Sequence, residues 1–348
     1  MVETPDIMEV VARLVGEDVR EAVALSQGRN NRVYCVTMAS GRRVAVKSYL
    51  ARISDTRDRL GIEYGALELL HGNGIRQVPA PMACDRDRNL AVYEFVEGGP
   101  CVSSNVTDGD IDAASAFLMA LHEIGNTSGT HWSAMASEAC ISFGDSIRGI
   151  RVRKRELERV EGDGELYEAL RAFLVERLSP LLDRVVAWSG ERLATAGVGL
   201  DEPLDTGRRV LSPSDFGFHN AIRRPGGGLV FVDFEYFGWD DAAKMVADFV
   251  LHPGMTMTDA QKRRFVSSMR EGLPASARLE TRLPVAYALF GIKWCLILLN
   301  EFDPERLARR RFAGGAPDLA TAQARQLEKA ARMLDHVAEA HRDFPYDG

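Results

Sequence analysis

The sequence predicts an α+β fold, with a small antiparallel sheet in its N-terminal part and mostly helical structure after it. Strand-like segments rich in Val and Tyr occupy residues 21–25, 32–37, 43–49 and 90–96, and such residues favour strands. Helical patterns dominate from about residue 108 onward. Because only short turns separate the first three strands, we expect them to form an antiparallel meander.

The composition is that of an ordinary globular protein of 348 residues, with 46% apolar and 27% charged residues. A net charge of −7 argues against a nucleic-acid partner. The five cysteines are widely spaced and form no C-x-x-C pair, so we expect reduced thiols and a cytoplasmic location. The most apolar run, residues 289–299, is too short to span a bilayer and contains Lys293, so we expect a buried helix and no membrane partner. The sequence does not specify the oligomeric state.

A predicted hairpin gathers three oxygen-bearing side chains. Residues 221–223 and 229–232 look like short strands joined by a Pro-Gly-Gly-Gly turn. Two strands joined by a turn run antiparallel, so Asn220 before the first strand and Asp233 after the second lie at the same end. Asp215 precedes Asn220 by five residues. Two carboxylates and an amide oxygen suit Mg²⁺, although the same residue types also occur in polar turns without any ligand.

A lysine on the third strand has a candidate carboxylate partner. Lys47 ends the run Val-Ala-Val-Lys, and a strand lysine most often points into solvent. Residues 60–70 are predicted to be helical, and Glu63 and Leu67 share one face by their i, i+4 spacing. Because an unpaired charge on a core-facing side is costly, we expect Glu63 to pair with Lys47. Glu68 is the competing carboxylate, but its register directs it elsewhere.

The order D-x4-N, a short hairpin and then D-F resembles the catalytic loop and metal-binding segment of kinase-like phosphotransferases. It is most similar to the aminoglycoside phosphotransferase and choline kinase family. The resemblance implies a bilobal protein-kinase-like fold, Asp215 as the catalytic base, and Asn220 and Asp233 as ligands of Mg²⁺. One departure is Pro213, which replaces the His that the family usually has two residues before the catalytic Asp.

The same resemblance implies a nucleotide site in the N-terminal part. Val-Ala-Val-Lys resembles the strand whose lysine holds the nucleotide phosphates, so Lys47 would take this role and Glu63 would position it. A loop containing Gly28 would cover the phosphates. Backbone groups around Glu94 and Val96, at the end of the last strand, would bind the base of ATP or GTP.

The resemblance also implies two lobes. Residues 1–97 would form the N-terminal nucleotide-binding lobe with its hinge, and residues 98–348 the helical lobe with the catalytic loop, metal site and acceptor pocket. Residues 98–214 form a segment that is far longer than the matching part of a protein kinase. They resemble the helical insert that helps to form the acceptor pocket in small-molecule kinases.

A basic run in this insert has three interpretations. It consists of Arg148, Arg151, Arg153, Lys154, Arg155 and Arg159. Such a run most often forms the solvated face of a helix; an anionic acceptor is the alternative, and nucleic acid a weak third. The same holds for the run Arg306, Arg309, Arg310 and Arg311.

Residues after the metal segment also have two interpretations. Asp240 and Asp241 could bind an amino-bearing acceptor or cap the following helix. Tyr236, Phe237 and Trp239 could contact a cationic acceptor or pack beneath the loop.

We therefore predict a kinase that transfers the γ-phosphoryl of ATP or GTP to a hydroxyl of a small molecule such as an aminoglycoside, sugar or amino alcohol. One alternative is a nucleotide-binding pseudokinase with a regulatory role. Pro213 favours it, and the intact Asp215, Asn220 and Asp233 argue against it. A kinase acting on protein is the other alternative, against which the long insert argues.

Overall fold

The computed structural model describes residues 4–27, 31–49, 57–102, 105–127, 131–303 and 319–347. The chain forms two compact units. Unit 1 comprises Met1–Ser137 and Pro213–Gly238, and unit 2 comprises Glu138–Ser212 and Trp239–Gly348. The late hairpin therefore groups with the N-terminal part of the chain rather than with the helices of unit 2 that flank it in sequence. The lobe boundary at residue 97 stays a prediction.

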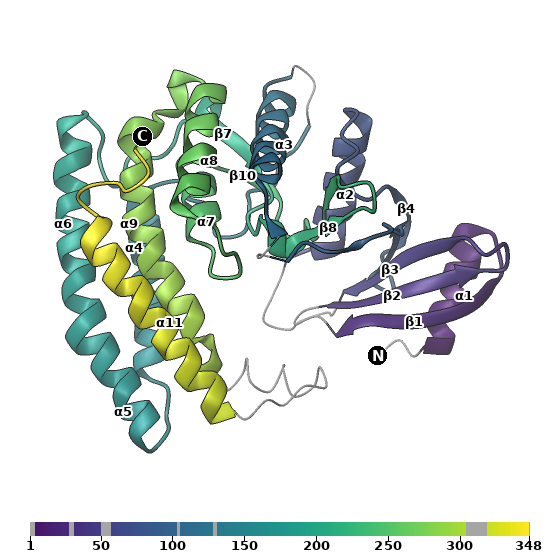
Figure 1. Cartoon of the computed structure of the whole chain (residues 1–348), viewed down its shortest axis with the longest axis horizontal. Helices are drawn as coiled ribbons and strands as arrows, with labels where there is room; N and C mark the ends of the chain where they lie inside the picture. The colour runs from purple at the N-terminus through teal and green to yellow at the C-terminus, as the bar shows by residue number, and fades with distance from the viewer. Residues whose placement is uncertain are drawn as a thin grey trace. The chain divides into compact units, whose positions relative to one another are not determined.

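A five-stranded antiparallel sheet forms the centre of unit 1, in the order β1-β2-β3-β5-β4 (Figure 1). Its strands are β1 (Val19–Gln27), β2 (Asn31–Met38), β3 (Arg43–Tyr49), β4 (Pro81–Asp85) and β5 (Leu90–Glu94). The predicted meander is confirmed, because β1 pairs with β2 and β2 with β3. The fourth predicted strand ends at Glu94, two residues earlier than expected.

Strand alternation directs β3 toward a different helix on each face. Val44 and Val46 join a buried apolar cluster that includes Ile7 and Val11 of α1 (Thr4–Val15). Lys47 has the opposite orientation because successive side chains of a strand alternate. It reaches α2 (Arg59–Gly72), the helix predicted over residues 60–70. One strand thus contributes both to the core and to the site.

The late hairpin adds a second small sheet to unit 1. Strands β8 (Ala221–Arg223) and β9 (Leu229–Phe231) pair antiparallel, as predicted, and β6 (Gly99–Pro100) pairs with β8. Gly98 lies just before β6 with φ of +144°, and a Cβ there would come within 2.1 Å of the Arg223 carbonyl oxygen. The chain after the first sheet therefore reaches the hairpin closely only because a glycine occupies this position.

Aromatic side chains pack the hairpin against a helix. Helix α3 (Asp108–Asn126) is fixed at its start by a capping box between Thr107 and Asp110. Its Phe117 ring stacks on Phe216 at 5.5 Å and contacts Phe231 at 4.8 Å between ring centroids. These rings join the loop before the hairpin and its second strand to one helix.

Unit 2 is mostly helical and is arranged around α9. Its helices are α4 (Phe143–Glu158), α5 (Glu165–Ala172), α6 (Ser179–Thr195), α7 (Ala242–Leu251), α8 (Asp259–Gly272), α9 (Leu279–Leu298) and α11 (Leu319–Ala340). Helix α9 contacts α4, α6, α7 and α11 (Figure 1). Strands β7 (Arg209–Ser212) and β10 (Gly238–Asp241) form a short two-stranded sheet.

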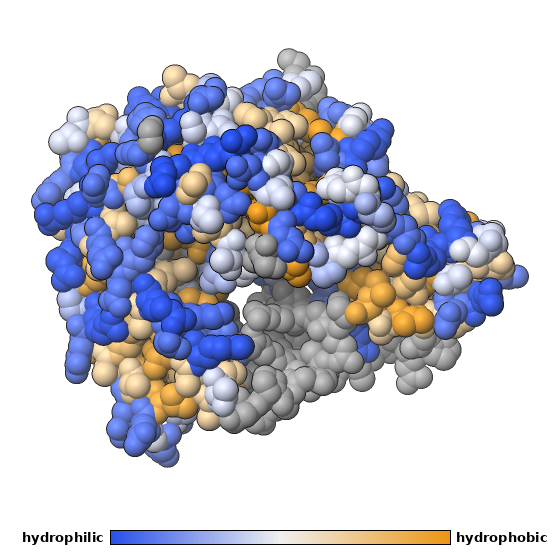
Figure 2. Space-filling view, viewed as in Figure 1, coloured by the Kyte–Doolittle hydropathy of each residue, from blue (hydrophilic) through white to orange (hydrophobic). Residues whose placement is uncertain are grey.

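Helix α9 contains the apolar run that the sequence assigns to a buried helix, and this prediction is confirmed. The 24-residue stretch 279–302 is long and apolar enough to cross a membrane by length and composition alone, but 72% of its most apolar window is buried inside the protein. Hydrophilic residues predominate on the visible face of the surrounding helices (Figure 2). This distribution is typical of a core helix.

Candidate functional site

Lys47 lies at the centre of a charged cluster in unit 1. Its side chain is buried, and its Nζ donates to Glu63 Oε2 and to Asp233 Oδ1, both at 2.6 Å. A third carboxylate oxygen, Glu235 Oε2, lies 4.0 Å away. The predicted Lys47–Glu63 pair is confirmed. Lys47 does not point into solvent, as a strand lysine most often does.

The carboxylates keep the Lys47 ammonium charged. Burial by itself lowers the pKa of Lys47, but Asp233, then Glu63 and Glu235, raise the pKa well above its usual value. A buried lysine with one weak partner would instead tend to lose its proton. Lys47 therefore keeps its positive charge at neutral pH.

Glu63 is fixed from several directions. The Tyr49 hydroxyl donates to Glu63 Oε2 at 2.7 Å, and the Phe234 backbone N–H donates to Oε1 at 3.3 Å. Tyr49 is itself hydrogen-bonded to the Tyr93 hydroxyl at 2.7 Å. Burial raises the pKa of Glu63, and Lys47 opposes that rise. Glu68, the competing carboxylate, is exposed.

Asp233 combines a left-handed backbone with partial exposure. It follows β9 with φ of +71°, a conformation that Asp tolerates better than most residues. Its side chain remains 37% exposed, whereas Glu63 and Glu235 are buried. Asp233 is therefore the carboxylate of this cluster that is most available to a ligand.

The cluster fits a divalent cation chemically. Glu63, Asp233 and Glu235 each offer a carboxylate oxygen, and these atoms lie within 4.8 Å of one another. Hard oxygen donors are the ligands that Mg²⁺ prefers. Because Glu63 and Glu235 are buried and Asp233 is partly exposed, Asp233 is the residue that fits the role of metal ligand best.

Asp215 and Asn220 lie together at the base of the hairpin. Asn220 ends a short 3₁₀ turn, η4 (Phe218–Asn220), and its Nδ2 donates to the Asp215 backbone oxygen at 3.0 Å. The Val232 N–H donates to the Asn220 carbonyl at 2.9 Å, so Asn220 and the residue before Asp233 adjoin as predicted. The catalytic and metal roles of these residues stay predictions.

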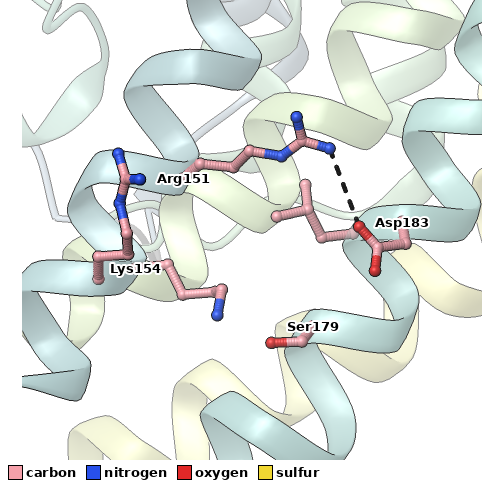
Figure 3. A pocket seen from close by; sticks show the side chains of 6 residues that line it. Arg151, Lys154, Ser179 and Asp183 are labelled. Atoms are coloured by element: carbon pink, nitrogen blue, oxygen red, sulfur yellow. Dashed lines mark ion pairs between the residues drawn. The ribbon is translucent and has the colours of Figure 1, made fainter.

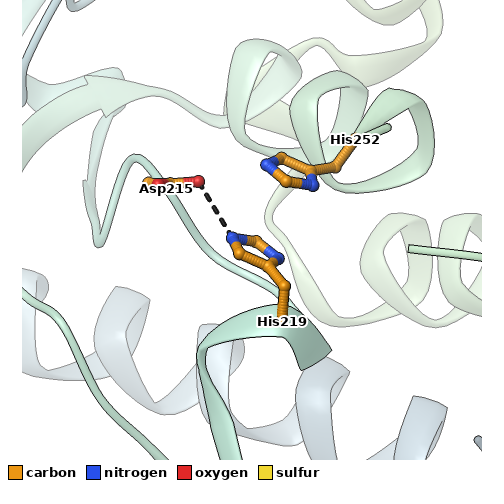
Figure 4. A group of neighbouring side chains, drawn as sticks. All are labelled: Asp215, His219 and His252. Atoms are coloured by element: carbon orange, nitrogen blue, oxygen red, sulfur yellow. Dashed lines mark hydrogen bonds and ion pairs between the residues drawn. The ribbon is translucent and has the colours of Figure 1, made fainter. Parts of the chain in front are cut away.

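His219 contacts the Asp215 carboxylate, and this contact was not predicted from the sequence. Its Nε2 lies 3.1 Å from Asp215 Oδ1 (Figure 4). The Asp215 side chain is 38% exposed. The position of His219 directly before Asn220 was the available signal, but the family usually has its His before the Asp, where this chain has Pro213. A histidine four residues after the Asp therefore orients the carboxylate.

Of the residues predicted to contact the nucleotide, the structure describes Glu94 and Val96 but not Gly28. The Glu94 N–H donates to the Ala80 carbonyl at 2.8 Å, so this N–H is already engaged. The Glu94 carboxylate accepts from Arg224 at 3.0 Å. Val96 is buried. Gly28, predicted to lie in the phosphate-covering loop, falls outside the described residues.

The basic run lies mostly on α4 in unit 2. A cavity of about 270 Å³ is lined there by Arg151, Lys154, Arg155, Ser179, Leu182 and Asp183 (Figure 3). Arg151 is 3.9 Å from Asp183, and Lys154 donates to Glu158 at 2.6 Å. Arg151 and Lys154 thus each have an acidic partner, which favours the solvated-face interpretation. Arg306, Arg309, Arg310 and Arg311 fall outside the described residues.

The residues after the metal segment have structural partners. Asp241 caps α7 by accepting from the Ala243 N–H at 2.9 Å, so the capping interpretation is confirmed for this residue. Asp240 accepts from Lys244 at 2.7 Å. Phe237 is fully buried and packs edge-on against Trp132 at 5.0 Å, as the packing interpretation expects.

An N-terminal antiparallel sheet with a buried Lys–Glu pair, an aspartate bonded to that lysine and a helical remainder are the features of a phosphotransferase of protein-kinase-like fold. The chain belongs to the phosphotransferase enzyme family, whose model matches residues 21–268. The predicted family and the predicted phosphotransferase class are therefore confirmed. No curated protein matches the chain significantly.

Solved structures show the same fold at low identity. A spectinomycin phosphotransferase in complex with ADP and spectinomycin has a TM-score of 0.65 and 14% identity, over 98% of this chain and 99% of that chain. A choline kinase from Cryptosporidium parvum Iowa II has a TM-score of 0.61 and 13% identity, over 99% and 100%. The choline kinase LicA from Streptococcus pneumoniae has a TM-score of 0.59 and 18% identity, over 95% and 98%.

Proposed function

We propose that this phosphotransferase transfers the γ-phosphoryl group of ATP or GTP to a hydroxyl of a small molecule, with Mg²⁺ as cofactor. The observation that carries the proposal is the double contact of Lys47, which bonds Glu63 on one side and Asp233 on the other at 2.6 Å each. A buried ammonium held between a helix and the metal segment is the arrangement that phosphoryl transfer requires for placing phosphates.

The charged cluster supplies electrostatic stabilisation. Lys47 would bind the nucleotide phosphates, while Glu63 keeps its ammonium in place. Asp233 and Asn220 would hold Mg²⁺, which neutralises charge on the phosphates when bound. Fixed charges in a partly buried site lower the barrier because they need no rearrangement during the reaction.

Asp215 would act on the acceptor. Its half-exposed carboxylate can accept the proton of an incoming hydroxyl. His219 and the Asn220 amide hold the Asp215 segment from two sides. Lys47 would therefore place the phosphates, and Asp215 would accept the proton.

The acceptor class rests on the family and on the similar structures. One of these proteins binds ADP and spectinomycin, and others are choline kinases. We therefore propose acceptors among aminoglycosides, amino alcohols, choline-like amines and sugars. The cytoplasmic location and the absence of nucleic-acid and membrane partners stay predictions.

A nucleotide-consumption screen tests the proposal. The purified protein is incubated with Mg²⁺, ATP or GTP, and a library of hydroxyl compounds, and the products are identified by mass spectrometry. The Asp215→Asn variant, which keeps the shape of the side chain, is the control. We expect a phosphorylated product with the wild-type protein and a strong loss of product with the variant. Product formation at equal rates by both proteins would refute the proposed role of Asp215.

A further inference from the structure

Glu235 is a buried acid two residues after Asp233 to which no role is yet assigned. Only 2% of its surface is exposed. Its Oε1 accepts from Arg59 Nη1 at 3.0 Å, and its Oε2 accepts from Asn31 Nδ2. Lys47 Nζ, at 4.0 Å, lies beyond hydrogen-bond distance. Each carboxylate oxygen is thus engaged by a protein donor.

Asn31 and Arg59 come from different elements of unit 1. Asn31 is the first residue of β2 and the last residue of the segment 26–31 that the sequence assigns to the phosphate-covering loop. Arg59 is the first residue of α2, the helix that carries Glu63. Glu235 therefore fixes the starts of a strand and a helix to the metal segment, at a point next to Lys47.

The surroundings of Asn31 favour an amide side chain at this position. The residue is 6% exposed, and its Oδ1 has no hydrogen-bond partner among the residues that the structure describes. The amide group faces a carboxylate, so the nitrogen must point toward Glu235. An aspartate at position 31 would instead place two carboxylates in contact, which is strongly unfavourable in a buried site.

We propose that Glu235 is a positioning residue that couples β2 and α2 to the metal segment, and that it is not a metal ligand. This inference rests on the proposed function, because its consequence is tighter binding of the Mg-nucleotide. The charge of Arg59 and the hydrogen bond from the Asn31 amide make the buried carboxylate tolerable without a metal ion.

A reciprocal substitution tests the contact. In Asn31→Asp, like charges meet, so we expect a lower Tm of the nucleotide-free protein and a Kd for Mg·ATP or Mg·GTP that rises by about tenfold, a typical coupling between residues in contact. In the double variant Asn31→Asp with Glu235→Gln, the glutamine amide can donate to the new carboxylate at position 31 while its oxygen still accepts from Arg59. We expect most of the Tm and the nucleotide affinity to return.

Two further measurements separate positioning from metal binding. Glu235→Gln should leave the Mg²⁺ dependence of turnover near that of the wild type, whereas Asp233→Asn should shift it to higher Mg²⁺. With saturating nucleotide, kcat of Asn31→Asp should stay close to the wild-type value although KM for nucleotide rises. Asp85→Asn, which alters an Arg13–Asp85 contact elsewhere in unit 1, is the matched control and should leave the nucleotide Kd unchanged.

Failure of the inference differs from failure of the proposed function. If the wild-type protein binds neither Mg-nucleotide, the proposed function fails and the inference with it. If the wild type binds nucleotide but Asn31→Asp binds equally well, or the double variant recovers nothing, the positioning role is wrong. A Mg²⁺ requirement of Glu235→Gln that shifts as much as that of Asp233→Asn would make Glu235 a metal ligand instead.

Discussion

The charge balance around Lys47 explains why the cluster suits a cation. Three carboxylates, from Glu63, Asp233 and Glu235, surround the site, while Lys47 and Arg59 supply two positive charges. These five groups together carry one net negative charge, and Asp233 is the exposed carboxylate among them. A divalent cation at that position would reverse the sign and attract phosphates.

Lys47 is the residue on which nucleotide placement depends most. In Lys47→Met the chain keeps its length but loses the charge, so we expect kcat/KM for the Mg-nucleotide to fall by about 100-fold or more, as for other preorganised electrostatic groups. Arg43→Met, at the exposed start of the same strand, is the control and should retain nearly full activity. Steady-state kinetics distinguish them, and a Lys47→Met enzyme with wild-type kcat/KM would contradict the assignment.

Single residues differ in how well the sequence predicts them. Lys47, Glu63 and Asp233 were predictable because strand alternation, helix register and hairpin geometry each fix a direction. Glu235 and His219 were not, because their roles depend on partners such as Arg59 and Asp215 that only the tertiary structure brings to them. The spacing of residues along the sequence does not predict which side chains the tertiary structure brings into contact.

At the scale of elements, helix α7 is held by an internal charge cluster. Lys244 donates to Asp240 at 2.7 Å and lies 3.1 Å from Asp248, one turn away on either side. Lys244 and Asp240 are fully buried, and burial raises the pKa of Asp240 while Lys244 opposes that rise. The helix therefore depends on a lysine that has no place in the proposed chemistry.

Lys244→Met should destabilise the protein strongly. The substitution leaves buried carboxylates without their cation, and the expected loss is about 3–5 kcal/mol in the free energy of unfolding. Arg332→Met removes an i, i+4 pair with Glu328 on the exposed face of α11 and should cost no more than about 0.5 kcal/mol. Urea denaturation measures both values, and equal losses in the two variants would show that burial of the cluster is unimportant.

Elements with regular patterns were predicted, and irregular ones were not. The meander β1–β3, the hairpin β8–β9 and helix α9 have clear periodicity or turn residues. The sequence gives no comparable signal for β10, which has four residues, or for the π-helix η2 (Phe173–Leu178) that precedes α6. Pairing of β10 with β7 and the widened turn of η2 arise from packing rather than from local preference.

At the scale of the whole molecule, the net charge of −7 contrasts with the basic run on α4. Arg151 is about half exposed and has a carboxylate partner at 3.9 Å, which favours the solvated-face interpretation of the run. We expect Arg151→Glu to leave KM for nucleotide and for acceptor within about twofold of the wild-type values, since exposed pairs contribute little. A selective rise in the acceptor KM would instead identify this face as the site of an anionic acceptor.

The central claim for the molecule is a division of roles within one hairpin site. Asp215, oriented by His219, would act on the acceptor, and Asp233, bonded to Lys47, would act on the metal and nucleotide. The two aspartates differ in their partners although both are half exposed. Removing each in turn should therefore change different steps of the reaction.

Isothermal titration of Asp215→Ala and Asp233→Ala with the Mg-nucleotide, combined with kcat of each variant, tests this claim most directly. We predict that Asp215→Ala binds the Mg-nucleotide like the wild type but loses about 10²–10⁴-fold in kcat, the usual contribution of a general base. We predict that Asp233→Ala loses both binding and turnover, because the metal loses a charged ligand. Wild-type turnover by Asp215→Ala, or wild-type Mg-nucleotide binding by Asp233→Ala, would contradict the division of roles.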